Sequence, residues 1–215
     1  MTTTLQGTFD IDALIHQAEV ENAPEWDGAP LRYHEEYTPP EQLDAAFERY
    51  RFEHGSYACI PASHMWNRDR GIHLPVASVN GHELHLFSAD GDCRKHWAPE
   101  HLHRHAPGEL PGKHMSQAIC PTCTWHHIGS HEEVIESWHD HAFPGWRDLP
   151  VVPANIREHG GEKRRIRKLH EWIAEHYPDE WQKPHHPIRT ERQAHGMRAV
   201  AGGSPWRGYD LAANR

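Results

Sequence analysis

Apolar side chains recur at helical spacing in four stretches of the chain. These stretches are residues 10–21, a segment beginning at Thr38, residues 131–142 and residues 161–177. Asp10 opens the first stretch, and Ser130 precedes the third with Glu133 three positions further on, which is the pattern of helix caps. Pro178 directly follows the fourth stretch, where a helix must stop because proline cannot continue it. The pattern therefore predicts four helices.

Strand-like alternation of apolar and polar residues is found in residues 76–88. The Asn80-Gly81 pair interrupts it, and this dipeptide is typical of the two-residue turn of a β-hairpin. Short strands are also expected on both sides of the Cys-Pro-Thr-Cys segment at residues 120–123. The predicted fold class is α+β: a small antiparallel sheet with a zinc-finger-like centre, made of a knuckle, a strand and a helix, and with flanking helices.

The chain is long enough for one core, and its nine Trp, six Tyr and five Phe argue against disorder although only 37% of its residues are hydrophobic. Residues 183–215 show little apolar periodicity. We therefore expect a single zinc-binding α+β domain followed by an extended C-terminal arm. The domain covers residues 1–182, with a helical N-terminal part (1–75), a zinc-centred part (76–155) and a basic helix (156–182), and the arm covers residues 183–215.

Charge is distributed unevenly between the two parts of the chain. Residues 1–155 contain 10 Lys and Arg against 23 Asp and Glu, a net charge of −13, whereas residues 156–215 contain 12 against 8, a net charge of +4. Only the C-terminal part therefore attracts a polyanion. The basic stretch from Lys163 to Lys168 is the expected phosphate contact, and the alternative is a solvated helix face.

The N-terminus has no basic region followed by an apolar run, and no apolar stretch has the length of a membrane span. We expect a cytoplasmic protein with no membrane contact. In a reducing compartment a Cys-x-x-Cys pair more often binds metal or performs redox chemistry than forms a disulfide.

Cys120 and Cys123 have the spacing that lets two thiolates occupy two corners of a tetrahedral zinc (Zn2+) site. Cys93 is the first choice for the third ligand, because thiolates bind zinc strongly and this residue follows the predicted hairpin. His139 is preferred as the fourth ligand, followed by His141 and then His96. The wider set of candidates is Cys93, His96, His126, His127, His131, His139 and His141.

Two other interpretations compete with a structural zinc site. A redox Cys-x-x-Cys begins a helix in a βαβ setting, whereas this one is expected inside a hairpin. The segment from Trp138 to Pro144 superficially resembles the Asp-His-x-x-Pro motif of ββα-metal nucleases. In this interpretation Asn155 and His159 would complete a His-Asn-His set.

Several motifs resemble those of an uncharacterised family of small actinobacterial and actinobacteriophage proteins. The resemblance lies in Cys-Pro-Thr-Cys-Thr-Trp at 120–125, Trp-His-Asp-His-Ala-Phe-Pro-Gly-Trp-Arg-Asp-Leu-Pro at 138–150 and Gly-Tyr-Asp-Leu at 208–211. It implies an actinobacterial or phage origin and a place for Cys93 beside the knuckle, but it carries no activity. The expected function is a non-enzymatic zinc-binding protein that recognises a protein or nucleic-acid partner, and the alternative is a metal-dependent nuclease.

Overall fold

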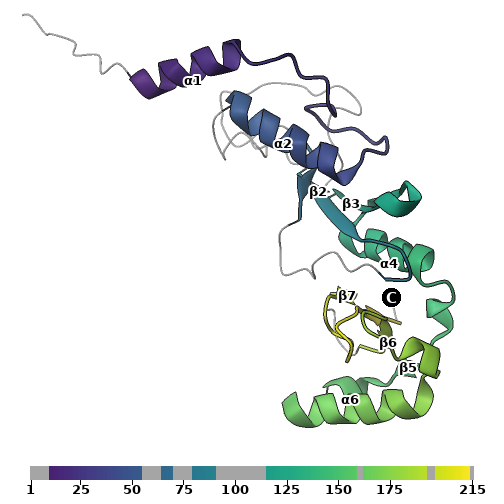
Figure 1. Cartoon of the computed structure of the whole chain (residues 1–215). Coiled ribbons are helices and arrows are strands. Elements are labelled where there is room, and N and C mark those ends of the chain that lie inside the picture. Colours follow the sequence, from purple (N-terminus) through teal and green to yellow (C-terminus); the bar gives the residue numbers. More distant parts are fainter. Residues whose placement is uncertain are drawn as a thin grey trace, which may run out of the picture.

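The computed structural model of this protein describes residues 10–54, 64–69, 79–90, 115–158, 162–192 and 197–213. Its helices are α1 (Ile11–Glu21), α2 (Pro40–His54), α4 (His131–Ala142), α5 (Ala154–Glu158) and α6 (Glu162–His176), as Figure 1 shows. Within the same ranges the chain forms three short 3-10 turns, η2 (Pro121–Cys123), η3 (Trp146–Asp148) and η4 (Asp179–Trp181). No helix among these residues is long and apolar enough to cross a membrane.

The first sheet is antiparallel, with the strand order β1-β2-β3-β4. Its strands are β1 (Asn67–Arg68), β2 (His85–Ala89), β3 (Met115–Cys120) and β4 (Trp125–Gly129). Successive side chains of β2 and β3 point to opposite faces of the sheet and pack in two different cores. Phe87 and Ile119 pack with Leu43 of α2, whereas Leu86 and Ala118 belong to the core that includes α4.

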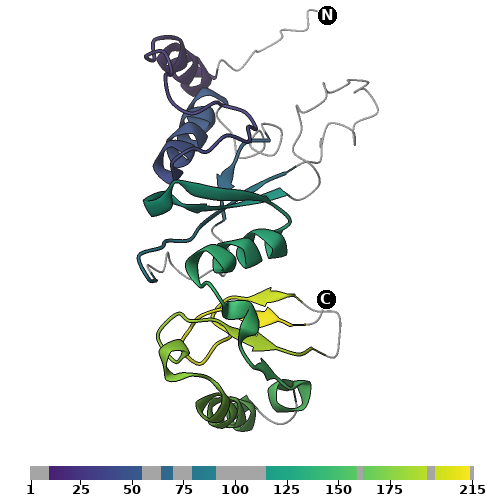
Figure 2. The ribbon, with the colours of Figure 1, turned by 90° about the vertical axis from the view of Figure 1, so that its right-hand side faces the viewer.

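The second sheet lies on the other side of α4, so that α4 is covered by a sheet on each face (Figure 2). Its strands are β5 (Val151–Val152), β6 (Ile188–Thr190), β7 (Ala199–Val200) and β8 (Asp210–Ala212), in the order β5-β6-β8-β7. The β5–β6 and β6–β8 pairs are parallel and the β7–β8 pair is antiparallel. Helices α5 and α6 lie beyond this sheet, at the end of the molecule away from α1 (Figures 1 and 2).

The prediction of an extended C-terminal arm at 183–215 differs from this structure, because β6, β7 and β8 all come from that segment. Each strand is only two or three residues long, too short to leave a clear alternation in the sequence. Buried side chains hold them instead: Ile188 and Leu211 are 0% and 1% exposed. Gly208 passes so close to the His186 carbonyl that any side chain there would collide with it.

The α+β class and the knuckle, strand and helix at its centre are confirmed. Asp10 caps α1 by accepting a hydrogen bond from the Ala13 backbone N–H (3.1 Å), and Ser130 and Glu133 form a capping box at the start of α4. The predicted strand at 76–88 is described only from Val79 onward, where an Asn80-Gly81 turn leads towards β2.

Candidate metal centre

The knuckle connects the two central strands of the first sheet. Cys120 ends β3 and lies opposite Trp125, the first residue of β4. Between them the chain turns through η2, and Thr124 adopts a left-handed conformation with φ 51°. Its backbone N–H donates to the Pro121 carbonyl oxygen (3.2 Å), which closes the turn. Both thiols are thereby held at the same end of the sheet.

A second turn brings His82 to the knuckle. Asn80 and Gly81 have φ values of 53° and 80°, as a type I′ turn requires. Val79 and His82 exchange two backbone hydrogen bonds of 2.8 Å across it. Trp138 of α4 donates its indole N–H to the Glu83 carbonyl oxygen (3.0 Å), so the turn is attached to the helix that carries the next candidate ligand.

His141 lies in the last turn of α4. Its ring stacks on Trp125, with the centroids 4.8 Å apart and the planes 5° from parallel, and it meets the His82 ring edge-on at 4.6 Å. Burial lowers the pKa of His141, and proximity to His82 lowers it further. A neutral imidazole, which is the form that binds metals, is therefore favoured at pH 7.

These contacts gather four side chains that suit a metal ion: His82, Cys120, Cys123 and His141, with one ligand atom from each within 4.8 Å of the others. The Nδ1 atom of His82 lies 3.8 Å from the sulfur of Cys120 and 3.3 Å from that of Cys123. Zinc bonds of about 2.3 Å to sulfur and about 2.0 Å to nitrogen give tetrahedron edges of roughly 3.3 to 3.8 Å. The two separations from His82 have these lengths, and the donor set of two sulfurs and two nitrogens is of the kind that binds a tetrahedral ion.

Without an ion, the two thiols disfavour each other's ionisation. Desolvation raises the pKa of the Cys123 thiol, and its hydrogen bond with Cys120 and the charge of Cys120 raise it further. A bound divalent ion reverses this balance, because it stabilises both thiolates directly.

Cys120, Cys123 and His141 were predicted as ligands, and the structure brings them together. His139, the preferred fourth ligand, lies elsewhere. It is two positions before His141, about 200° around the helix, and therefore faces the opposite side. Its side chain is 0% exposed, packs edge-on against Tyr209, and donates from Nδ1 to the Ile135 carbonyl oxygen (2.7 Å). Burial lowers its pKa to about 4.

The other candidates divide into two groups. Cys93 and His96 lie outside the described residues, whereas His126, His127 and His131 are described but stand outside the four-residue group. His126 places its Nε2 3.0 Å from the Glu35 carbonyl oxygen.

His82 was not among the ligands predicted from the sequence. The signal that marks it is its position directly after the Asn80-Gly81 turn, because such a turn fixes the backbone of the next residue.

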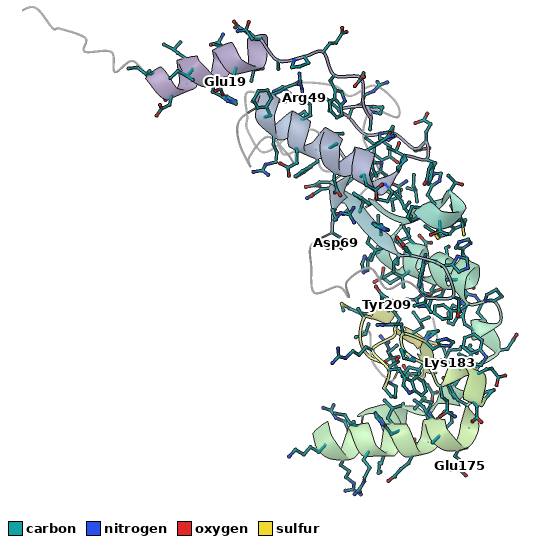
Figure 3. All side chains as sticks on the ribbon, viewed as in Figure 1. Glu19, Arg49, Asp69, Glu175, Lys183 and Tyr209 are labelled. Carbon is teal, nitrogen blue, oxygen red and sulfur yellow. The ribbon has the colours of Figure 1, made fainter. Side chains whose placement is uncertain are left out.

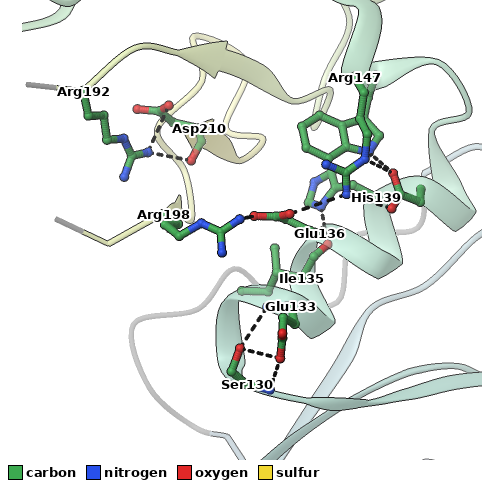
Figure 4. Close-up of polar contacts among 11 residues, drawn as sticks. Ser130, Glu133, Ile135, Glu136, His139, Arg147, Arg192, Arg198 and Asp210 are labelled. Atoms are coloured by element: carbon green, nitrogen blue, oxygen red, sulfur yellow. Dashed lines mark hydrogen bonds and ion pairs between the residues drawn. The ribbon is translucent and has the colours of Figure 1, made fainter. Parts of the chain in front are cut away.

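The face of α4 that carries His139 and Glu136 bears a set of ion pairs (Figure 4). Glu136 is 8% exposed and pairs with Arg198 and with Arg147 (3.5 Å to the latter). Arg147 also donates to both carboxylate oxygens of Asp140 (2.8 and 2.9 Å). Burial would raise the pKa of Asp140, but hydrogen bonds from Arg147 and Trp146 lower it below its ordinary value.

Comparison with known proteins places most of the chain in one family. Residues 28–215 match the model of a family of unknown function, DUF6349, which leaves α1 outside the matched region. A search of curated proteins and a search of solved structures gave no match.

Proposed function

The chain belongs to DUF6349, a family of unknown function, and we propose that it is a non-enzymatic protein in which a structural zinc ion holds together a scaffold for recognising a partner. The observation that supports this is the group of two thiols and two imidazoles contributed by the 79–84 turn, the knuckle and α4. A site with four protein ligands has no open position for water or substrate, which is the pattern of structural zinc.

Zinc is the favoured ion because of the donor set. Thiolate and imidazole ligands in tetrahedral array suit zinc, whereas magnesium and calcium prefer oxygen ligands. The ion would join three segments that are distant in sequence, since His82 and His141 are separated by 58 intervening residues. Its role is therefore to fix the turn and the end of α4 against the knuckle.

The nuclease alternative is less well supported by the described residues. A general base must reach the water that attacks the phosphate, but His139 is fully buried and His141 belongs to the candidate metal group. Asn155 lies exposed on α5, and His159 is outside the described residues.

The test is the zinc content of the purified protein and of single variants, measured by plasma mass spectrometry. We expect one zinc per chain in the natural sequence and a loss of zinc in Cys120→Ser, Cys123→Ser and His82→Ala. His127→Ala is the matched control, because His127 is exposed on β4 and stands outside the group. Retention of zinc by Cys120→Ser, or an equal loss in His127→Ala, would contradict the proposed site.

The function itself is tested separately. The zinc-loaded protein is expected to leave supercoiled plasmid intact in the presence of magnesium or manganese. Cleavage that disappears in His141→Ala while the fold is retained would establish the nuclease instead.

A further inference from the structure

Helix α6 carries a concentrated positive charge. Five of the six residues from 163 to 168 are basic: Lys163, Arg164, Arg165, Arg167 and Lys168. Lys163, Arg164 and Arg167 are exposed. Among the described ion pairs only Arg167 of this set takes part, at 3.6 Å from Glu171, where both side chains are about two-thirds exposed or more. Such an exposed pair neutralises little of the charge.

The order of charges along α6 opposes helix stability. The peptide dipoles make the N-terminal end of a helix positive, so stability favours acidic residues there and basic residues at the C-terminal end. In α6 the basic cluster occupies the first half and Glu171 and Glu175 occupy the second. Glu162 at the start of α6 and His176 in its last turn suit the dipole, but the five cations between them lie against it. An external anion would offset this unfavourable placement.

The apolar face of α6 is already occupied. Ile173 of α6 and Tyr177, the residue directly after the helix, are 1% and 4% exposed and belong to the main core, with Leu169 packed against it. Among the described residues of α6, Ile166 alone is a large hydrophobic residue with an exposed side chain. The helix therefore has no free apolar stripe to insert into a bilayer or a protein groove. A partner of α6 would therefore be bound through the charged side chains of its outward face.

The position of α6 keeps this charge away from the acidic part of the molecule. Glu175 marks one end of α6 in Figure 3, and side chains with nitrogen tips project from the other end. The helices at the opposite end of the molecule carry acidic residues, Asp12, Glu19 and Glu21 on α1 and Glu41, Asp44, Glu48 and Glu53 on α2. A polyanion that approaches the first half of α6 is therefore far from these carboxylates.

We propose that the outward face of the first half of α6 binds the phosphate backbone of duplex nucleic acid without reading its sequence. The six residues span about 9 Å of helix axis, and a duplex carries one charge per roughly 1.7 Å, so the two charge densities are similar. Three of the five basic residues are arginines, whose planar forks match phosphate oxygens. This assignment rests on the proposed recognition role and names the class of partner that is recognised.

The experiment is fluorescence anisotropy with a labelled 20-base-pair duplex and the full, zinc-loaded chain, repeated from 50 to 200 mM salt. With about four phosphate contacts, the affinity is expected to fall about 100-fold over this range. The combined variant Lys163→Gln, Arg164→Gln, Arg167→Gln, Lys168→Gln should lose most of the binding. Two duplexes of different sequence should bind equally.

Matched controls use charges of the same region. Lys183→Gln and Arg207→Gln remove exposed cations outside the cluster and should change the affinity by less than roughly two-fold. Glu171→Gln removes the ion-pair partner of Arg167 and should strengthen binding. Zinc content and circular dichroism of every variant separate this test from that of the metal site. A variant that binds the duplex poorly but keeps its zinc and its fold supports the assignment.

Several outcomes would overturn it. They are no binding at 50 mM salt, equal binding by the combined variant, stronger binding to anionic vesicles at equal phosphate concentration, and self-association that competes with the duplex. None of these outcomes would change the conclusion drawn from the zinc measurements. If the protein bound no zinc, the duplex titration would still test the basic face of α6.

Discussion

Helix α4 lies between two sheets that are held in different ways. The first sheet has antiparallel strands of five or six residues at its centre. Three of the four candidate ligands lie at the ends of its strands or in its turns, and α4 supplies the fourth, His141. The second sheet has strands of two or three residues that come from distant segments and pair mostly in parallel. Its stability must therefore come from side chains packed on α4 rather than from long hydrogen-bonded ladders.

Two kinds of stabilisation thus meet at one helix. On one side of α4, His141 joins a group that a cation can hold together; on the other, His139 is a neutral core residue and Glu136 forms ion pairs. Different treatments should therefore destabilise each side: chelators the first, and truncation of core side chains or high salt the second.

The largest effect is expected from loss of the metal. Structural zinc supplies about 10 kcal/mol or more in small zinc-dependent domains, so its removal from this protein should cost several kcal/mol, with part of the core remaining. We expect a chelator, or Cys120→Ser, to lower the melting temperature by more than about 10 °C. His127→Ala should melt as the natural chain does. A chelator without effect on the zinc-loaded protein would show that the ion does not stabilise the fold.

Core truncation in the second sheet comes next. Ile188 is 0% exposed on β6, so Ile188→Ala should cost about 3 kcal/mol through lost burial and an internal cavity. Thermal or urea unfolding measures this cost, and zinc content should stay at one per chain. Ile166→Ala, at a half-exposed apolar position on α6, is the control and should change stability by less than about 1 kcal/mol. Zinc loss in Ile188→Ala would show that the two sides of α4 are not separable.

High pH should also act through the second sheet. Burial raises the pKa of Tyr177 and Tyr209 to about 12. Because the folded state holds these protons more tightly, their contribution to stability is complete below pH 10 and is lost as the pH rises from 10 to 12. We expect each to contribute about 2 kcal/mol. Between pH 10 and pH 12 the melting temperature of Tyr209→Phe should therefore fall less steeply with pH than that of the natural chain. An identical slope would show that Tyr209 does not lose its proton on unfolding.

The smallest effect is expected at the ion pairs of α4. Glu136→Gln leaves Arg198 and Arg147 with weaker partners, at a cost of about 1 kcal/mol, or about 3 °C in melting temperature. The exposed pair of Glu171 and Arg167 provides the control, and Glu171→Gln should cost about 0.3 kcal/mol. The cost of Glu136→Gln should shrink in high salt. A cost larger than that of Ile188→Ala would show that ion pairs, not core packing, dominate on this side of α4.

The two sheets also differ in how far the sequence predicted them. The helix caps, the Asn80-Gly81 turn and the knuckle are local signals, because the residues that make each structure are neighbours in the chain. The second sheet has no such signal, since β5 pairs with β6 across more than thirty intervening residues and its strands are too short to alternate.

The candidate site shows the same division. Cys120 and Cys123 are three positions apart, so the sequence alone shows them as a pair. His82 joins them only because β2 and β3 are neighbours in the sheet. Helical spacing placed His139 and His141 on different sides of α4 but did not show which side faces the knuckle. That choice depends on tertiary packing: His139 fits among aromatic side chains such as Tyr209, and His141 stacks on Trp125.

X-ray absorption at the zinc edge tests the proposed metal site most directly, because it measures the atoms bound to the ion in the purified protein. We expect two sulfur atoms at about 2.3 Å and two nitrogen atoms at about 2.0 Å, with the sulfur signal lost in Cys120→Ser and one nitrogen lost in His82→Ala. Three sulfurs and one nitrogen, with the third sulfur lost in Cys93→Ser, would contradict the ligand set of His82, Cys120, Cys123 and His141. A bound water in place of one protein ligand would contradict the structural role.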